Sequence, residues 1–328
     1  MTKFLYYALR LIQSDIYLLQ KGSDQPHVYA SDIQYIKVPA VSVPIQKKAL
    51  AEAHAIEKEI ETIESSIKKN GEIIDDVFNR EFRFAMDKFN RTKQAKRFSA
   101  NYRTLSNNAD LRFSAKFHRD SGNFVMQELM NRTDKKIKHY LAVPIVLGAS
   151  VSPSDYSDDG EFCYISMATI KNWKFDLESA STVSKEYSDS KQAKTVRKND
   201  IILARSGEGT IGKVALIDDD ELQGVFADFT MRIRLKDYNP EFAYYYFRTT
   251  YFQYLIEIYK KGLGNNTNIF PIVVREFPML DISLEEQQRI VDKIHAEIAK
   301  QDEIKKQIES LRGQIDVMIQ DVLTQNQG

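Results

Sequence analysis

The pattern of hydrophobic and polar positions in this 328-residue chain contains an internal repeat. Residues 4–22 and 242–262 each begin with Phe, carry two tyrosines in register and an Arg six residues after the Phe, and end at Lys-Gly. A short polar turn and a strand-like stretch ending in an apolar residue and proline follow each copy. Each copy then enters a long helix, at Gln46 or Gln287, with a constant offset of 241. A duplicated unit therefore organises the chain.

The two long helices carry apolar residues at a 3.5-residue spacing with charged flanks, a pattern typical of a coiled coil. Each spans roughly 40 residues and is therefore about 60 Å long. Their shared register favours pairing with each other over separate packing on globular domains, although Glu297 and Gln301 interrupt the seam. The expected interface consists of Ile56, Ile60, Ile63, Ile67 and Ile74 from the first helix, and Ile294, Ile304, Ile308, Leu311 and Ile315 from the second.

The stretch between the helices, at about residues 90–284, predicts a mixed, strand-rich domain. Short apolar runs bounded by turn residues indicate strands over residues 163–170, 200–207, 212–217 and 231–235. The predicted fold class is therefore α+β. Its expected parts are the C-terminal remnant of a first domain (1–45), a first coiled-coil helix (46–88), a complete domain (89–285) and a second coiled-coil helix (286–328).

Composition limits the possible functions. Lys and Arg number 46, as do Asp and Glu, so bulk basicity gives no argument for nucleic-acid binding and any basic surface must be local. The single cysteine, Cys163, excludes an intrachain disulfide framework and cysteine-based zinc sites, and it permits a reducing compartment. The longest apolar stretch, residues 140–151, is too short to cross a bilayer. We expect a cytoplasmic protein with no membrane partner.

Catalytic motifs are missing or incomplete. Residues 207–213 fit the first seven positions of a phosphate-binding loop, but Val214 replaces the required Ser or Thr, so a Gly-rich hairpin is expected. No two prolines are adjacent, which removes the base-holding loop of adenine amino-methylating enzymes. The only Glu-x-Lys, Glu303 with Lys305, lies on a coiled-coil helix, and no nucleophile is paired with a base. We therefore predict no catalytic residues, no metal site and no cofactor in this chain.

Local basic clusters favour binding instead. They lie at residues 91–119, where aromatic residues are interleaved, at 132–139 and at 185–198. Such clusters on a neutral chain fit phosphate contacts combined with base readout, although ordinary solvated surface explains any single cluster equally well. The candidate DNA-facing residues are Arg97, Arg103, Arg112, Lys116, Arg205, Ser206, Lys213, Asn265, Asn266 and Thr267.

The order of these segments resembles the DNA-specificity (S) subunit of type I restriction-modification systems. The resemblance rests on KNDIILARSG (198–207) with IGKVALI, the Tyr-rich helix at 243–247, the turn at 262–268, and Phe277-Pro278 running into LEEQQRIVDKI (284–294). It covers essentially the whole chain, and the first copy, ending at Val38-Pro39, resembles the closure of a preceding target recognition domain.

The resemblance implies a non-catalytic protein that binds double-stranded DNA. Each recognition domain would read one half of a split site, and two antiparallel spacer helices would fix the gap. Modification subunits would bind AdoMet and methylate adenine at N6, and a restriction subunit using ATP and Mg²⁺ would join them. Only one recognition domain is complete here. A truncated gene product, a half-subunit that dimerises and a partner for a second specificity chain remain open explanations.

Other functions also remain open at this point. The chain fits a recognition subunit of a related nuclease-methylase system, or a coiled-coil protein-interaction module whose central domain binds protein. Strongly salt-dependent duplex binding would separate DNA recognition from protein binding. A nuclease would require Mg²⁺-dependent cleavage by the isolated chain.

Overall fold

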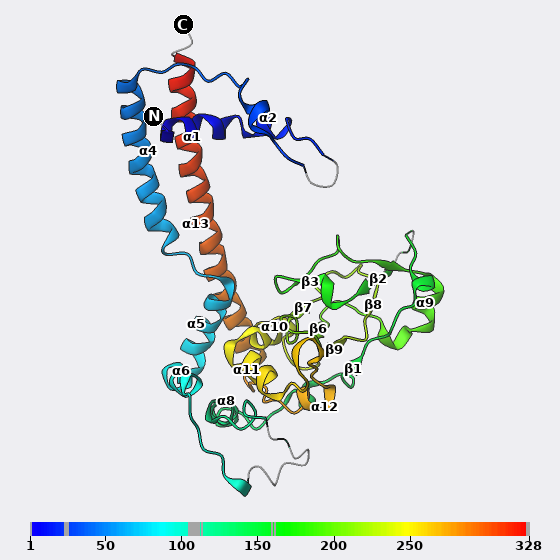
Figure 1. Cartoon of the computed structure of the whole chain (residues 1–328). Helices are drawn as coiled ribbons and strands as arrows, with labels where there is room; N and C mark the ends of the chain where they lie inside the picture. The colour runs from blue at the N-terminus through cyan, green and yellow to red at the C-terminus, as the bar shows by residue number, and fades with distance from the viewer. Residues whose placement is uncertain are drawn as a thin grey trace. The chain divides into compact units, whose positions relative to one another are not determined.

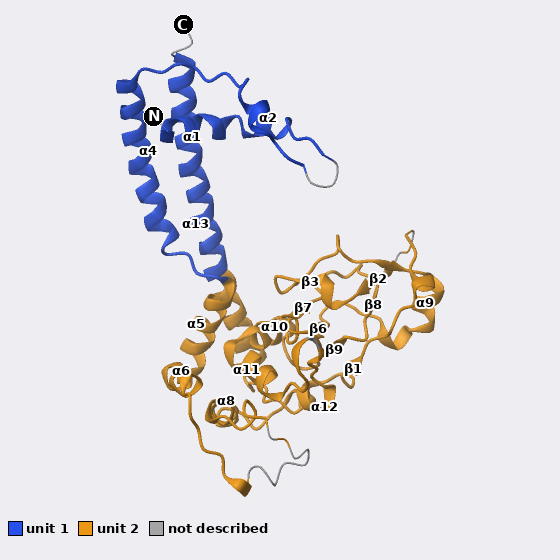
Figure 2. Cartoon of the chain, in the orientation of Figure 1, with its two compact units in different colours: residues 1–69, 297–328 blue, residues 70–296 orange. Residues whose placement is uncertain are grey.

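The computed structural model describes residues 2–22, 26–103, 112, 114–158, 160 and 162–325, and only the backbone of Asn265. The fold is α+β, as predicted. Figure 2 shows two compact units, one formed by residues 1–69 and 297–328 and the other by residues 70–296. These boundaries differ from the expected four-part division, because the strand-rich unit includes helical residues on both sides of the predicted domain.

The first unit is helical. Helices α4 and α13 lie alongside each other in Figure 1, and they run antiparallel. Arg312 donates to Glu64 at 2.7 Å, and the Lys68 N–H donates to Gln301 Oε1 at 2.9 Å, so residue numbers rise along one segment as they fall along the other. The helices of this unit are α1 (Thr2–Leu11), α2 (Gln13–Tyr17), α3 (Ala30–Ile33), α4 (Val43–Glu64) and the C-terminal part of α13 (Leu284–Gln325).

One hydrophobic core joins α1, α4 and α13. Phe4 and Tyr7 of α1 are buried in it. Eight of the ten expected interface residues belong to this core: Ile56, Ile60, Ile63, Ile67, Ile304, Ile308, Leu311 and Ile315. The other two, Ile74 and Ile294, are fully buried but lie in the second unit.

The first long helix is not continuous. Residues 46–88 were expected to form one helix, but the chain instead forms α4, α5 (Asn70–Phe82) and the start of α6 (Met86–Gln94). Ser65 and Ser66 donate side-chain hydrogen bonds to carbonyls of the preceding turn, each at 2.6 Å, and such bonds compete with helix continuation. Gln301 lies at this break, where its side chain accepts the Lys68 N–H. The polar residue that interrupts the seam thus accepts a backbone N–H in the segment between α4 and α5.

The second unit contains three small sheets. A four-stranded antiparallel sheet has the order β1-β9-β6-β7, a three-stranded sheet has the order β5-β2-β8 with β2 and β8 parallel, and β3 pairs with β4. The strands are β1 (Val146–Leu147), β2 (Phe162–Ile165), β3 (Ile170–Lys171), β4 (Lys174–Phe175), β5 (Thr182–Val183), β6 (Ile201–Ala204), β7 (Val214–Leu216), β8 (Gly224–Phe226) and β9 (Thr230–Ile233).

Helices pack on these sheets. Helix α10 contacts β7, and α11 contacts α8. Asn239 begins α10 as its N-cap, accepting the N–H groups of Glu241 and Phe242 at 2.9 and 3.0 Å, and Pro240 occupies the first helical position. The remaining helices are α8 (Asp120–Met130), α9 (Lys185–Ser190), α10 (Pro240–Arg248), α11 (Thr250–Tyr259) and α12 (Pro271–Val274), with short 3-10 turns η1 to η5 between elements.

The internal repeat is visible as repeated hydrogen bonding. The Gln46 side chain donates to the Val41 carbonyl at the start of α4, and Gln287 donates to the Ile282 carbonyl near the start of α13, both at 2.8 Å. After each Lys-Gly, the lysine backbone pairs in both directions with a residue beyond the turn, Lys21 with His27 and Lys261 with Asn268. The two copies therefore share local structure as well as sequence.

Candidate nucleic-acid interface

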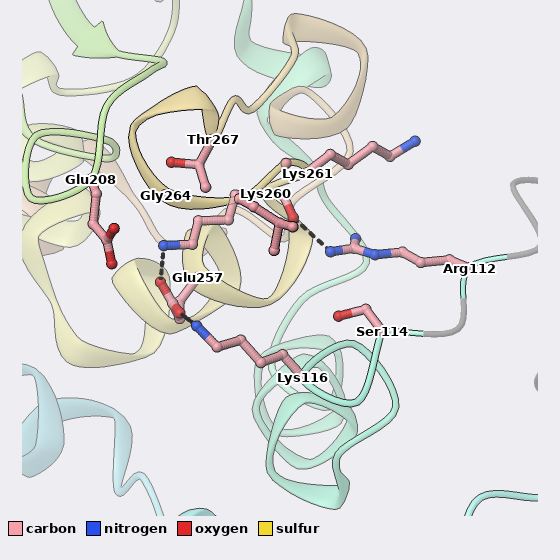
Figure 3. A pocket seen from close by; sticks show the side chains of 11 residues that line it. Arg112, Ser114, Lys116, Glu208, Glu257, Lys260, Lys261, Gly264 and Thr267 are labelled. Atoms are coloured by element: carbon pink, nitrogen blue, oxygen red, sulfur yellow. Dashed lines mark hydrogen bonds and ion pairs between the residues drawn. The ribbon is translucent and has the colours of Figure 1, made fainter.

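A cavity of about 640 Å³ opens in the second unit where three segments distant in sequence meet (Figure 3). One segment precedes α8, one is the Gly-rich turn between β6 and β7, and one is the end of α11 with the turn that follows it. The residues lining the cavity are Arg112, Ser114, Lys116, Glu208, Glu257, Lys260, Lys261, Gly262, Leu263, Gly264 and Thr267.

Hydrogen bonds hold the Gly-rich turn against the turn after α11. The Ser206 hydroxyl donates to the Thr267 carbonyl at 3.1 Å, and the Gly207 N–H reaches the same carbonyl at 3.3 Å. The Ile269 N–H then donates to the Arg205 carbonyl at 2.9 Å. Residues 205–213 join two antiparallel strands, as expected for a hairpin rather than a nucleotide-binding loop.

Gly262 makes the turn after α11 possible. Its φ is +101°, a conformation that residues with a side chain rarely adopt. A Cβ at this position would lie 2.3 Å from the Asn266 carbonyl oxygen. The turn therefore requires glycine, and it brings Lys260, Lys261 and Thr267 to one cavity wall.

The cationic residues of the cavity are held by specific partners. The Arg112 guanidinium donates to the Lys260 carbonyl at 2.6 Å and stacks over the Phe117 ring at 4.6 Å. Lys116 and Lys260 both form ion pairs with Glu257, and the pair with Lys260 is 2.7 Å long. Burial alone would raise the pKa of the Glu257 carboxyl, but the hydrogen bonds from the two lysines outweigh it and hold that pKa below its usual value. Glu257 is therefore ionised at neutral pH.

Arg205 lies beside the cavity and is anchored. Its Nε donates to the Asp228 carbonyl at 2.9 Å, and its Nη1 donates to the Asn268 side chain at 3.0 Å. The guanidinium also lies over the half-exposed rings of Phe229 and Phe270, at 5.8 and 5.9 Å from their centroids. Arg205 thus connects the β6 end to two loops.

The structure brings together part of the predicted DNA-facing set. Arg112, Lys116 and Thr267 line the cavity, Ser206 donates to Thr267 in its wall, and Arg205 donates to the neighbouring Asn268. The other predicted residues lie outside the cavity lining: Arg97 and Arg103 are exposed beyond α6, Lys213 is half-buried before β7, Asn266 is exposed in the 3-10 turn η5 (Gly264–Asn266), and the side chain of Asn265 lies outside the described residues.

Sequence reasoning missed four charged cavity residues, Glu208, Glu257, Lys260 and Lys261. Glu257 lies in a helix that the sequence predicts from its apolar pattern alone. Its partner Lys116 is 141 positions away, so no local signal indicates their contact. Lys260 and Lys261 come directly before Gly262, and two lysines beside a turn glycine are the sequence feature that could have indicated them. The described residues contain no cluster of three or more His, Cys, Asp or Glu side chains suited to a metal ion. No helix in the described part of the chain has the length and apolarity needed to cross a membrane.

The cationic cavity of this fold is suited to binding an anionic ligand. The sequence matches the family described as type I restriction modification DNA specificity domain over residues 144–311, just over half of the chain. The chain belongs to this family, which confirms the resemblance found in the sequence. It is therefore a type I restriction-modification specificity protein, and the role of that class is DNA recognition. No curated protein sequence matches the chain.

The solved structures to which this chain is similar include three from type I restriction-modification systems. A structure titled as the basis of complex assembly and conformational transition of the type I R-M system has 13% identity and a TM-score of 0.50, covering 98% of this chain and 70% of that one. The S subunit from M. genitalium has 15% identity and a TM-score of 0.41, with 98% and 72% covered. The HsdS subunit from Thermoanaerobacter tengcongensis has 14% identity and a TM-score of 0.37, with 98% and 69% covered.

Proposed function

We propose that this chain is a sequence-reading subunit of a type I restriction-modification complex, in which the second unit reads one half of a split DNA site. The observation that carries the proposal is the family match over residues 144–311. The paired helices α4 and α13 would act as the spacer that separates this half-site from the other. The cavity supports the proposal by gathering four cationic side chains on a chain of zero net charge.

The chemistry of modification belongs, on this proposal, to other subunits. Modification subunits would bind AdoMet and methylate adenine at N6, and a restriction subunit using ATP and Mg²⁺ would complete the complex. This chain would act by placing those subunits on the correct sequence. The absence of a nucleophile–base pair and of an adenine-holding proline loop from the sequence supports this division of roles.

The first unit carries an apolar face suited to a second recognition domain. Tyr6 is 58% exposed, whereas its repeat counterpart Tyr244 is 7% exposed and donates to the Trp173 carbonyl at 2.6 Å. Leu18 is 83% exposed, whereas its counterpart Ile258 is 3% exposed against Gly122 of α8. The strand-rich body of a recognition domain covers these positions in the second copy. We infer that such a body, from a second specificity chain or a second copy of this chain, covers them in the first.

The direct test is a pull-down of the tagged chain with its neighbouring gene products, followed by mapping of methylated adenines in cells with and without it. Loss of a bipartite methyl-adenine motif on deletion is the expected result, together with recovery of a methyltransferase. An unchanged methylome and a pull-down without a methyltransferase would reject the proposal.

A second measurement separates DNA recognition from a coiled-coil protein-interaction function. Duplex affinity measured from 50 to 200 mM salt should fall with a log–log slope of about −0.9 for each phosphate neutralised. A slope near zero would favour the protein-binding function, because a protein-binding module has no reason to release DNA counterions.

A further inference from the structure

The cavity contains a carboxylate, that of Glu257, which forms ion pairs with two of its lysines. In Figure 3 the Glu257 side chain lies between the ammonium groups of Lys116 and Lys260, which approach it from different segments. The Lys260 side chain is 13% exposed and that of Glu257 is 36% exposed, so this cluster is partly shielded from water. Two lysines that converge on the same point can bind an anion there, and in this structure the Glu257 carboxylate is that anion.

The surrounding groups extend this pattern. Arg112 and Lys261 also line the cavity, so its lining contains four cations and two carboxylates, Glu257 and the exposed Glu208. Thr267 is 4% exposed, and its hydroxyl has no hydrogen-bond partner among the described residues. A buried hydroxyl without a partner is unfavourable, and a tetrahedral oxyanion has more acceptor oxygens than a carboxylate to satisfy it.

We propose that this cavity binds one phosphate group and that Glu257 is its internal competitor, which the phosphate displaces from Lys116 and Lys260. The inference rests on the proposed function in that the phosphate source is the DNA backbone. Glu257 then keeps the two lysines ordered and neutralised until DNA arrives. On DNA binding, a backbone phosphate would replace the Glu257 carboxylate at the two lysines. The strength of the Glu257 ion pairs would therefore limit the affinity for DNA.

The sign of the effect distinguishes this role from ordinary structural support. Glu257→Gln removes the competing charge and leaves both lysines, so duplex affinity should rise about fivefold, the order expected for one charge interaction at a partly exposed site. Lys116→Ala removes a cation from the same ion pair, so affinity should fall and the salt slope should decrease by about one. Both variants break the same contact, and general misfolding cannot move affinity in opposite directions.

A matched control lies elsewhere in the second unit. Glu81 also joins two cations, Arg289 at 2.8 Å and Lys293 at 2.5 Å, but it does not line the cavity. Glu81→Gln should therefore leave duplex affinity unchanged. The experiment uses the full chain, a fluorescent duplex read by anisotropy at several salt concentrations, and inorganic phosphate titrated separately by calorimetry.

The two probes distinguish the possible results. Tighter duplex binding by Glu257→Gln, with no change in Glu81→Gln, supports the proposal with DNA as the source. Stronger inorganic phosphate binding by Glu257→Gln, with no duplex binding by any variant, supports the phosphate site but rejects the proposed DNA function. Wild-type affinities for both probes in Glu257→Gln overturn the phosphate site, and salt-dependent duplex binding in that case leaves the proposed function standing.

Discussion

The buried ion pair between Asp200 and Arg234 should be a major determinant of the stability of the second unit. The Asp200 side chain is 0% exposed, and both carboxylate oxygens accept from Arg234, each at 2.7 Å. The Arg197 N–H adds a third bond at 2.9 Å. Asp200→Ala leaves a guanidinium and a backbone N–H without their acceptor at the start of β6. Breaking a buried pair in this way costs about 3–5 kcal/mol, and the lower end applies here because the Arg234 side chain is 17% exposed and retains some access to water.

The chain provides its own probe for this measurement. Its single tryptophan, Trp173, lies between β3 and β4, so its fluorescence reports unfolding of the second unit. A loss of about 3 kcal/mol in a unit of this size should lower the melting temperature by about 6–12 °C. The urea midpoint should fall in the same variant without a change in the denaturant slope.

An exposed ion pair next to β6 is the matched control. Lys198 and Asp220 are 2.6 Å apart, but their side chains are 45% and 71% exposed. Asp220→Ala should therefore cost no more than about 1 kcal/mol. Replacing both buried partners, as in Asp200→Leu with Arg234→Met, should restore most of the lost stability, because no buried charge is left unpaired. A cost below about 1 kcal/mol for Asp200→Ala, equal to that of the control, would refute the argument from burial.

Three further predictions concern stability. Ile308→Ala in the α4–α13 core should cost about 2–5 kcal/mol by circular dichroism melting, whereas Val317→Ala, at a 62% exposed position, should stay within about 0.5 kcal/mol. Gly262→Ala should destabilise the turn after α11, whereas Gly313→Ala in the interior of α13, with nothing within 4 Å of the new Cβ, should raise stability by up to about 1 kcal/mol. Hydrogen bonds from two lysines lower the pKa of Glu276 to about 2, so its stabilising contribution is present above pH 4.5 and is lost as pH falls toward 2. The free energy of unfolding of Glu276→Gln, measured by chemical denaturation, should therefore be lower than that of wild type at pH 7. The two values should converge near pH 2.

The coiled-coil pairing could be predicted because it depends on a local period. A heptad pattern indicates which side of a helix is apolar. Eight of the ten residues expected from this pattern lie in or against one core. The same pattern cannot state that the backbone is continuous. Ile67 and Ile74 keep the period across the break at Ser65 and Ser66, but Ile67 packs partly buried against the core of the first unit and Ile74 is buried in the second unit. Division of the chain into units depends on tertiary packing, which a period of seven residues does not encode.

The cavity could be predicted only in part for a related reason. Arg112 and Lys116 stand out as a basic cluster in the sequence, and Thr267 stands out as part of a polar turn. Their meeting depends on the Ser206 and Gly207 bonds to a carbonyl about sixty residues away. Glu257 carries no signal of its own, because its role depends on two lysines brought to it by the fold.

The structure also changes what the basic clusters mean for DNA binding. In the cluster at 132–139, Arg132 donates to the Phe82 and Arg83 carbonyls, and Lys136 and Lys138 share Glu276. In the cluster at 185–198, the Lys194 ammonium donates to the Leu147 carbonyl, and burial lowers its pKa. These four cations already serve the fold, so a count of basic residues overstates the charge available to a phosphate backbone. On the proposal that phosphate displaces Glu257, this chain would bind DNA by exchanging internal partners for phosphates, and its salt dependence should then reflect the few cations that can change partners.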